Sequence, residues 1–546
     1  MKKVCPISGE EFEISQEDFK FYERLGLNPP TLAPLERMRR RLCYRNERRL
    51  YRRKCSATQE MIVSMYSPEK TFPVYENDFW WSDAWDARSY GREFDFKRPF
   101  FDQFFELVFS VPKMARIQQG HNENSKYTNC ASYNRNCYLI SGNRNEDCFY
   151  STSIVLSKDC VDCLSVSSCE LCYFCSDCSR SYQLSHCTEV HGSHEMDNCY
   201  DCRNCSNCFC CVGLRGKSYC VLNVPMERSE YDAIVNDPIK RAEALAKYEL
   251  LKNSVARLYT SYVNCENFSG SYLVNCKNVY SCWNCLEVEN AKYSGNLANS
   301  RDCYDVNYYG ATGSNELLCE CVSVGNGAYH VVGSAMIWGG STDISYSYEC
   351  FSSQRLFGCC GIRRAENCIF NMQYLKHEYD KLLDRIVAHM KETGEWGEFF
   401  PARFSPFGYN ETMAFDYLPL DKSEVLSRGL HWKEDELQIF SPSDVYQGPM
   451  EITLVGDDIL DKLLICKESG KAFKIIRKEL EFYRKQSLPI PSLAPEVRHQ
   501  LRNQRRNPRQ LFQRKCGNCS IPRLSPYGPE RGEKILCEDC YLKIVH

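Results

Sequence analysis

The feature that most constrains this chain is a comb of small residues at every third position. From Cys148 to Leu214 the comb holds 13 cysteines, 4 serines and 6 aliphatic residues, with no charged or aromatic side chain. The residues between the comb positions are mostly polar, aromatic or charged. The comb recurs from 276 to 306 and from 344 to 368. Cysteine also recurs at intervals of twelve: Cys163, Cys175, Cys187, Cys199 and Cys211.

A twelve-residue period with an inward residue at every third position is typical of a narrow β-solenoid. Small side chains would fill the interior of each coil, and successive coils would stack about 4.8 Å apart. Thiols suit so narrow an interior because they behave as small hydrophobes. One coil cannot bury its interior alone, so many must stack. The pattern therefore predicts a mainly β fold with two β-solenoid arrays of about 12 residues per coil, at 125–227 and 261–373.

Three other uses of these cysteines stay open. The run CELCYFCSDC (169–178) lacks the C-x3-C-P ending of a ferredoxin ligand set, which disfavours an iron–sulfur cluster. Zinc can bind pairs of the form C-x2-C, and disulfides can cross a coil in an oxidising compartment, for example between Cys169 and Cys175. Packing already explains the three-residue spacing, so we favour a structural role.

Two internal duplications organise the chain. Residues 5–80 align with 466–541 at a constant offset of 461, which pairs CPISGEEFEI with CKESGKAFKI and RRKC with QRKC. A second duplication, at an offset of 148, pairs FCCVGLRGKSYCVLN (209–223) with FGCCGIRRAENCIFN (357–371). We therefore expect two homologous end modules, 1–90 and 459–546, that enclose the two arrays.

The remaining segments connect these parts. We expect a connector at 91–124, a helical segment at 228–260 with Ser229 as its N-cap, and a helix at 374–394 that ends at Gly394. Segment 395–458 is rich in Phe, Pro and Gly, which indicates extended chain laid across a surface.

The C-terminal module carries the pattern Cys-x2-Cys-x17-Cys-x2-Cys, formed by Cys516, Cys519, Cys537 and Cys540. Two such turns can point four thiolates at one ion, as zinc ribbons and treble clefs do. Four sulfurs leave no open position for water, so the pattern predicts one structural Zn²⁺ site and no catalytic metal. Four free cysteines in a small core are the alternative.

The N-terminal module lacks this quartet. The equivalent positions hold Cys55, Thr58, Glu76 and Phe79, so one thiol remains. We expect this copy to be a degenerate module without zinc, in which Phe79, Trp80 and Trp81 form an apolar plug.

Arginines recur at matching positions in both end modules. The net charge of the chain is −3, so their positive charge is local, and a local basic stripe is typical of phosphate binding. The arginines can instead pair with acids of this protein, such as Glu434, Asp435 and Glu436, or with a protein partner. No base-reading motif is present, so we expect recognition of nucleic acid by shape and charge. The candidate residues are Arg37, Arg41, Arg45, Arg48, Arg498, Arg502, Arg505, Arg506 and Arg509.

The sequence also bears on compartment and activity. Its N-terminus, MKKVCPISGEEFEIS, lacks the apolar segment of a signal peptide, and no run of about 18 apolar residues indicates a membrane span. We therefore expect a cytoplasmic protein whose cysteines are thiols or metal ligands. It shows no nucleophile–base–orienter set, no P-loop and no dinucleotide fingerprint.

Several segments carry a resemblance. FKIIRKELEFYRKQSLPIPSLAP, RNPRQLFQRKCGNC, SPYGPERGEKILCEDCYLKIV and GEWGEFFPARFSPFGYN, together with the NC-x-NC arrays, resemble uncharacterised cysteine-rich proteins of small-genome candidate-phylum bacteria with a C-terminal zinc-ribbon-like module. The resemblance covers nearly the whole chain and implies no particular activity. It also implies a second cysteine quartet in the end module. Here only Cys466 matches, and Ser469, Ala494 and Val497 stand at the other positions.

These observations predict a non-enzymatic zinc-binding protein with a repeat scaffold that binds nucleic acid or a ribonucleoprotein through the Arg-rich helices. One alternative is a metal-cluster or thiol redox protein that uses the arrays. The other is a scaffold for protein partners without nucleic acid. The sequence indicates neither a membrane nor a small-molecule substrate.

Overall fold

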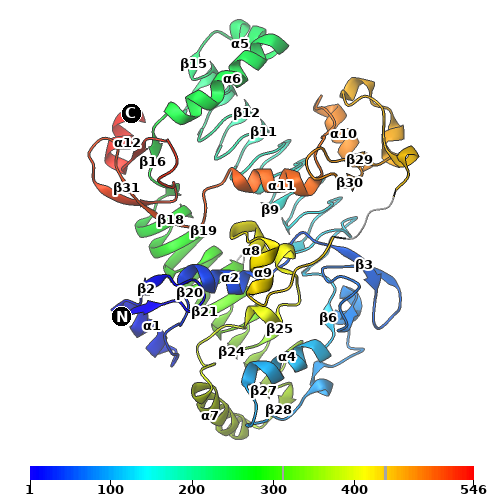
Figure 1. Ribbon diagram of the computed structural model, residues 1–546, viewed down its shortest axis with the longest axis vertical. Coiled ribbons are helices and arrows are strands. Elements are labelled where there is room, and N and C mark those ends of the chain that lie inside the picture. The colour runs from blue at the N-terminus through cyan, green and yellow to red at the C-terminus, as the bar shows by residue number, and fades with distance from the viewer. Residues whose placement is uncertain (310–312, 436–439, 546) are drawn as a thin grey trace.

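The computed structural model describes residues 1–309, 313–435 and 440–545. The fold is mainly β, and the described residues form twelve α-helices and a mixed sheet of 12 strands alongside smaller sheets. Two stacks of strands run through the molecule, and the helices and both ends of the chain lie against them (Figure 1). Among the described residues, no helix is both long enough and apolar enough to cross a membrane.

The first array consists of short strands that mostly pair in parallel with a segment twelve residues further on. Leu164 pairs with Thr152, and Tyr182 with His194. Single bridges at the same spacing, such as Ser176 to Thr188, continue the ladder between the longer strands. The strands are β7 (Ala131–Ser132), β8 (Gly142–Asn143), β9 (Thr152–Val155), β10 (Leu164–Ser167), β11 (Tyr182–Ser185), β12 (His194–Asp197), β13 (Ser206–Phe209), β14 (Ser218–Val221) and β15 (Val224–Pro225).

The second array repeats this pattern less regularly. Its last strands match β12 to β15 at the predicted offset of 148, but Ser300 pairs with Asn315 and Glu316 with Tyr329, steps of fifteen and thirteen residues. The spacing of twelve therefore holds at the end of this array and lengthens in its middle. Its strands are β17 (Tyr262–Val263), β18 (Glu266–Val274), β19 (Lys277–Lys292), β20 (Gly295–Tyr309), β21 (Asn315–Val324), β22 (Tyr329–Val332), β23 (Ala335–Trp338), β24 (Thr342–Ser345), β25 (Tyr348–Phe351), β26 (Gln354–Phe357), β27 (Glu366–Ile369) and β28 (Met372–Gln373).

The comb residues form the interior of the first array. Cys163, Cys175 and Cys187 are fully buried in one apolar cluster with the comb's Val, Leu and Ile residues. Their thiols donate to the backbone carbonyls of the residues two positions earlier, at 3.5, 3.3 and 3.3 Å. All 36 cysteines of the chain are free thiols. The thiols thus pack as small hydrophobes whose weak polarity is met by the backbone.

The residue before each inward position adopts a left-handed backbone conformation. Asp147, Asp159 and Asn204, for example, have φ values of 50°, 48° and 52°. Asn and Asp enter this region more readily than most other residues that carry a side chain. This explains the repeated Asn-Cys and Asp-Cys dipeptides, which mark the left-handed positions in the sequence.

The two end modules contain the same elements in the same order. Adding 461 to the bounds of α1, β3, β4 and β5 gives the bounds of α10, β31, β32 and β33. The N-terminal elements are β1 (Lys2–Val4), β2 (Glu11–Glu13), α1 (Gln16–Arg24), α2 (Pro34–Leu42), β3 (Tyr51–Lys54), β4 (Met61–Ser64), β5 (Val74–Tyr75) and α3 (Asn77–Trp81). The C-terminal elements are β29 (Leu464–Ile465), β30 (Ala472–Phe473), α10 (Arg477–Lys485), α11 (Pro495–Gln504), β31 (Phe512–Lys515), β32 (Pro522–Ser525), β33 (Ile535–Leu536) and α12 (Glu538–Val545).

Each end module connects the two arrays crosswise. In the N-terminal module β5 pairs with β6 (Lys113–Met114), just before the first array, while α2 packs on β20 and β21 of the second array. In the C-terminal module β33 pairs with β16 (Arg257–Leu258), just before the second array, while α11 packs on β10 of the first. Helices α2 and α11 consequently lie in the middle of the molecule (Figure 1).

The helices outside the modules differ in part from expectation. The connector 91–124 contains α4 (Phe100–Ser110), and 228–260 contains two helices, α5 (Arg228–Val235) and α6 (Pro238–Ser254). Ser229 lies inside α5 and is not its N-cap, which is Glu227. Helix α7 (Lys376–Glu392) is followed by Gly394 with φ of 74°, as predicted.

Segment 395–458 is not wholly extended. It forms two short α-helices and several 3₁₀ turns that pack between the modules and the arrays. These elements are η2 (Ala402–Phe404), η3 (Tyr409–Glu411), α8 (Met413–Tyr417), α9 (Lys422–Ser427), η4 (Pro442–Asp444), η5 (Ile452–Leu454) and η6 (Asp457–Asp461). The remaining 3₁₀ turn, η1 (Ala87–Tyr90), lies at the end of the N-terminal segment 1–90.

Candidate metal centre and the arginine contacts of the end modules

The four predicted cysteine ligands converge at one point of the C-terminal module. The Sγ atoms of Cys516, Cys519, Cys537 and Cys540 all lie within 4.8 Å of one another, and those of Cys519 and Cys537 are 3.6 Å apart. Zn–S bonds of 2.3 Å in a tetrahedron place sulfurs about 3.8 Å apart. Cys519 is exposed and the other three are buried. The quartet can therefore hold a metal ion in a closed site of four sulfurs.

Amide groups donate hydrogen bonds to two of these sulfurs. The Cys537 amide donates to Cys516 Sγ at 3.3 Å, and the Asn518 side-chain amide donates to Cys540 Sγ at 3.3 Å. Burial raises the pKa of the Cys516 thiol, but the amides of Cys519, Cys537 and Asn518 outweigh it and lower the pKa to about 6. A thiol that ionises readily is what metal ligation requires.

Three other turns repeat this fold with a hydroxyl in place of the second thiol. Around Cys55, the Gln59 amide donates to the Cys55 carbonyl and the Glu76 amide donates to Cys55 Sγ at 3.4 Å, which matches the contacts of Cys516. Burial opposes ionisation of Cys55, but the Thr58 hydroxyl and nearby amides lower its pKa. Ser8 and Ser469 act in the same way on Cys5 and Cys466. In these three turns a hydroxyl therefore forms a hydrogen bond at the position where the quartet has the second cysteine of its C-x2-C pair.

The aromatic residues of the N-terminal module divide between two contacts. Phe79, at the position of Cys540, packs edge-on against Tyr75 with ring centroids 5.1 Å apart. Trp80 and Trp81 instead pack on Phe351 of β25, at 5.5 and 4.9 Å. Of the three residues expected to form a plug, two therefore contact the second array.

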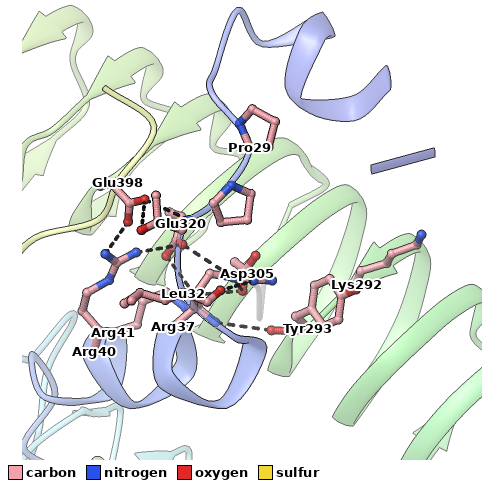
Figure 2. Close-up of polar contacts among 12 residues, drawn as sticks. Pro29, Leu32, Arg37, Arg40, Arg41, Lys292, Tyr293, Asp305, Glu320 and Glu398 are labelled. Carbon is pink, nitrogen blue, oxygen red and sulfur yellow. Dashed lines mark hydrogen bonds and ion pairs between the residues drawn. The ribbon is translucent and has the colours of Figure 1, made fainter. Parts of the chain in front are cut away.

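The arginines of α2 are buried against carboxylates of the second array. Arg37 and Arg41 are 1% and 0% exposed, and both contact the fully buried Asp305 at 3.0 Å. Arg41 also contacts Glu320 at 2.8 Å. Figure 2 shows these side chains converging between α2 and the strands. Burial would lower the pKa of Arg37, but Asp305 holds it above its ordinary value.

The arginines of α11 make the same contact with the first array. Arg498 and Arg502 lie 2.9 and 2.8 Å from Asp162, which is also fully buried. The match extends to the surroundings, because Arg37 stacks over Tyr293 at 4.8 Å and Arg498 over Tyr150 at 5.0 Å. We call each pair of arginines with its aspartate an arginine clamp.

The two aspartates occupy equivalent steps of the two arrays. Val161, which precedes Asp162, connects through five parallel pairings to Val221 at the end of the first array. Tyr304, which precedes Asp305, connects through five pairings to Ile369 at the end of the second array, and Val221 and Ile369 are 148 residues apart. The arginine clamps are thus a duplicated feature of the fold. Sequence reasoning did not identify either aspartate.

The remaining candidate arginines are also used internally, with one exception. Arg506 contacts Asp177 at 2.7 Å, and its counterpart Arg45 bonds Ser323 Oγ and Glu47, both at 2.6 Å. Arg48 pairs with Glu496 of the other end module at 3.1 Å. Arg509 bonds Asn296 and stacks over Tyr417, and Arg505 stacks over Phe174 but stays exposed.

The structure therefore replaces the expected basic stripe with intramolecular contacts, the alternative that the sequence left open. Phosphate cannot reach Arg37, Arg41, Arg498 or Arg502 without displacing a helix from an array. The acids differ from those suggested by the sequence. Glu434 pairs with Lys422 and Asp435 with Lys471, while Glu436 lies outside the described residues.

Each module also places a tyrosine near a buried glutamate of its array. Tyr66 donates to Glu349 at 3.4 Å, and its counterpart Tyr527 lies 3.2 Å from Tyr200, which donates to Glu189 at 3.1 Å. Burial raises the pKa of Glu349 and of Glu189 to about 7. Burial thus favours the protonated form of both carboxyls.

The array thiols do not converge as the quartet does. Within the described residues, Cys516, Cys519, Cys537 and Cys540 form the only group of three or more potential ligands whose donor atoms approach one another closely enough for one ion. The geometry accordingly favours wall packing over a ligand set for the array cysteines.

No protein family and no curated protein matches the chain. Among solved structures it is similar to one described as a putative acetyltransferase from Desulfovibrio desulfuricans G20. The similarity covers 48% of this chain and 71% of that chain, at 11% sequence identity and a TM-score of 0.10. A similarity with so low a TM-score carries no argument about fold or function, so the functional argument rests on the residues themselves.

Proposed function

We propose that this protein is a non-enzymatic, zinc-stabilised scaffold built on two narrow β-solenoid arrays. The observation that carries the proposal is the internal use of its reactive side chains. The array thiols line a packed interior, the arginines of α2 and α11 clamp Asp305 and Asp162, and the quartet closes on itself. A protein whose array thiols and central-helix arginines serve its own assembly is suited to binding and presentation.

Parallel pairing at twelve-residue steps supports the solenoid part of the proposal. Each step brings a comb residue over the equivalent residue of the previous coil, as with Cys208 and Cys220. Stacked coils would bury these columns and leave the intervening residues outside. End modules and helices would then cover selected sides of each stack.

The four thiols of the quartet support zinc as the resident ion. Zn²⁺ favours tetrahedral thiolate sites, and with four protein ligands it serves structure rather than catalysis. Cys516 and Cys519 from one turn and Cys537 and Cys540 from the other would hold it, and the ion would tie β31 to α12. Metal analysis of the purified chain should give one zinc and no iron, and Cys516→Ser should lose the zinc. Several irons per chain with visible absorbance would instead support the redox alternative.

Thiol accessibility tests the scaffold itself. Because nearly all array cysteines are buried, Ellman's reagent should react in the native chain with few thiols beyond Cys130 and Cys265, which are partly exposed. After unfolding in denaturant with a chelator, all 36 thiols should react with the reagent. Rapid native reaction of most thiols would contradict the proposal. Free thiols throughout are compatible with a reducing compartment, so the cytoplasm stays our prediction.

A scaffold of this kind needs a partner. Nucleic acid or a ribonucleoprotein stays the partner that we propose, with a protein partner as the alternative. The arginines of the end modules no longer support this choice, because their contacts are internal. The surface that does support it lies on the first array.

A further inference from the structure

One side of the first array carries several arginines and no acidic residue. Parallel pairings join its residues into a single column, with steps of about 4.8 Å between strands: Ser132, Asn143, Val155, Ser167, Ser179, His191, Arg203 and Arg215. The residue after each of these has a left-handed backbone, and these residues form a second column beside the first: Tyr133, Arg144, Leu156, Ser168, Arg180, Gly192, Asn204 and Gly216. We call the two columns together the basic face.

The basic face holds cations without acids. None of its residues is Asp or Glu. Arg144 and Arg180 are exposed, Arg203 is partly buried, and no described carboxylate lies within ion-pair distance of these three. The buried Nε of Arg203 has no hydrogen-bond partner among the described residues. Arg215, at the end of the face, is the exception, because it pairs with Asp201 at 2.8 Å.

The arginines of the basic face also act on His191, which belongs to the same face. His191 accepts or donates a bond with Ser179 Oγ at 2.9 Å and lies one step from Arg203. Burial lowers the pKa of His191 to about 4, assisted by Arg203, Arg180 and Arg215. The imidazole is therefore neutral at physiological pH, and the arginines supply the positive potential of this face.

The equivalent column of the second array carries two aromatic residues, and the N-terminal module packs on it. Pairings place Trp338, Phe351 and Arg363 where the first array has His191, Arg203 and Arg215. Trp81 of the N-terminal module packs on Phe351 at 4.9 Å, and Trp338 packs on it at 4.8 Å. In the first array, no described aromatic ring stacks on His191, Arg203 or Arg215, and Tyr541 of α12 accepts a hydrogen bond from Arg215 at 3.0 Å. A ligand can therefore approach this column in the first array, whereas the N-terminal module packs on the equivalent column in the second.

Hollows border the basic face at both columns. A hollow of about 470 Å³ includes Leu156, Ser168, Arg180 and Gly192, with Lys158, Glu170 and His194 on its far wall. A second hollow, of about 220 Å³, includes Ser132, Asn143 and Val155 and reaches Trp338 of the second array. Glu170 belongs to the first hollow, and Glu47 lines the second. Small residues between the arginines leave room for a chain to lie flat along the columns.

We propose that the basic face binds the phosphate backbone of single-stranded nucleic acid. This inference rests on the proposed scaffold function and specifies its partner and site. The six steps from Arg144 to Arg215 span about 29 Å, which suits a polymer with phosphate at regular intervals better than a single anion. Tyr133 and Leu156, 60% and 53% exposed in the second column, offer surfaces on which bases can stack. These contacts would depend on the charge of the backbone and on base stacking. We therefore expect little sequence preference.

Fluorescence anisotropy with the full-length, zinc-loaded chain tests the proposal. The probes are a 30-nucleotide oligouridylate and an oligothymidylate of equal length. Combined Arg144→Glu, Arg180→Glu and Arg203→Glu should weaken binding about tenfold or more. The slope of log Kd against log salt should fall by about 2, since each phosphate contact on a single strand contributes about 0.7. Comparing the two probes shows whether the 2′-hydroxyl contributes.

The matched control reverses three exposed cations on the α5–α6 arm: Arg228→Glu, Lys240→Glu and Lys247→Glu. It applies the same change in net charge and should leave Kd within about twofold. Combined Arg144→Gln, Arg180→Gln and Arg203→Gln guards against misfolding of the charge-reversed chain and should also weaken binding. Zinc content and thiol protection of each preparation report on the scaffold separately. Absence of binding by the unaltered chain, or equal loss in the control, would overturn the assignment and favour a protein partner.

Discussion

The two end modules share their framework and differ in one corner. Both place two arginines of a central helix on a buried aspartate, Arg37 and Arg41 on Asp305 in one case and Arg498 and Arg502 on Asp162 in the other. Only the C-terminal module completes a quartet of thiols. The clamps therefore do not require the quartet, and a metal bound there would act locally on the last strands and on α12.

This comparison also separates two kinds of stabilisation. Buried ion pairs contribute little net stability when intact but cost much when one partner is removed, so they favour one docking geometry over others. A structural zinc contributes folding free energy directly, on the order of 10–16 kcal/mol in small zinc peptides. We therefore expect the clamps to define how the modules sit and the ion to hold a corner together.

The largest effect should come from removing the metal. Cys516→Ser or a chelator should unfold the corner formed by β31 to α12, at a local cost on the order of 10 kcal/mol. Hydrogen exchange should show lost protection across 512–545 and unchanged protection in 51–81. The matched control is Cys55→Ser, at the equivalent position of the other module, which should leave both regions protected. Loss of protection in 51–81 on chelation would show that the modules are not independent.

Breaking the arginine clamps should give the next largest effect. Asp162→Asn leaves Arg498 and Arg502 buried with only Glu479, 3.4 Å from Arg498, and should destabilise the chain by about 3–5 kcal/mol. Asp305→Asn should cost less, because Glu320 still neutralises Arg41. Melting temperatures of the two variants show which substitution destabilises the chain more. Equal melting temperatures for both variants and the unaltered chain would refute the clamp.

The buried glutamates that lie near the two end modules should make the stability of the folded chain depend on pH. Burial raises the pKa of Glu189 and Glu349 to about 7, so the folded chain keeps protons that the unfolded chain loses near its ordinary carboxyl pKa. Their contribution to stability is present at low pH and is lost as pH rises from about 4.5 to 7, by at most about 3 kcal/mol each. Glu189→Gln keeps the neutral form and should flatten the loss in melting temperature between pH 5 and pH 8. An unchanged slope would show that Glu189 does not titrate there.

The smallest effect should come from the hydroxyl that replaces a ligand. Thr58→Ala removes one hydrogen bond to the Cys55 thiol and should cost about 1 kcal/mol or less. Cys519→Ala, at the equivalent position, should lower zinc affinity sharply. Melting curves and zinc titrations of the two variants compare the two end modules at this equivalent position. A large destabilisation by Thr58→Ala would mean that the N-terminal turn depends on its hydroxyl as the other depends on its ion.

Periodicity and spacing in the sequence predicted the coarse plan but not the contacts. The comb, the duplicated modules and the quartet follow from repeats that a single chain displays. Helix α4 was missed although its sequence has helical spacing, with Phe100, Phe104 and Leu107 on the buried face and Asp102 and Glu106 on the other. The clamp aspartates were missed because Asp162 and Asp305 lie 143 residues apart, not 148, and only the longer steps of the second array bring them into register. Arginine spacing alone could not distinguish internal carboxylates from phosphate.

Hydrogen exchange on the two clamp variants tests the central claim most directly. If the modules dock crosswise through their arginines, Asp162→Asn should expose the amides of α11 and spare those of α2, and Asp305→Asn should do the reverse. Zinc content should stay at one ion per chain in both. Protection that is unchanged in both helices, or lost equally in both by either substitution, would contradict the account.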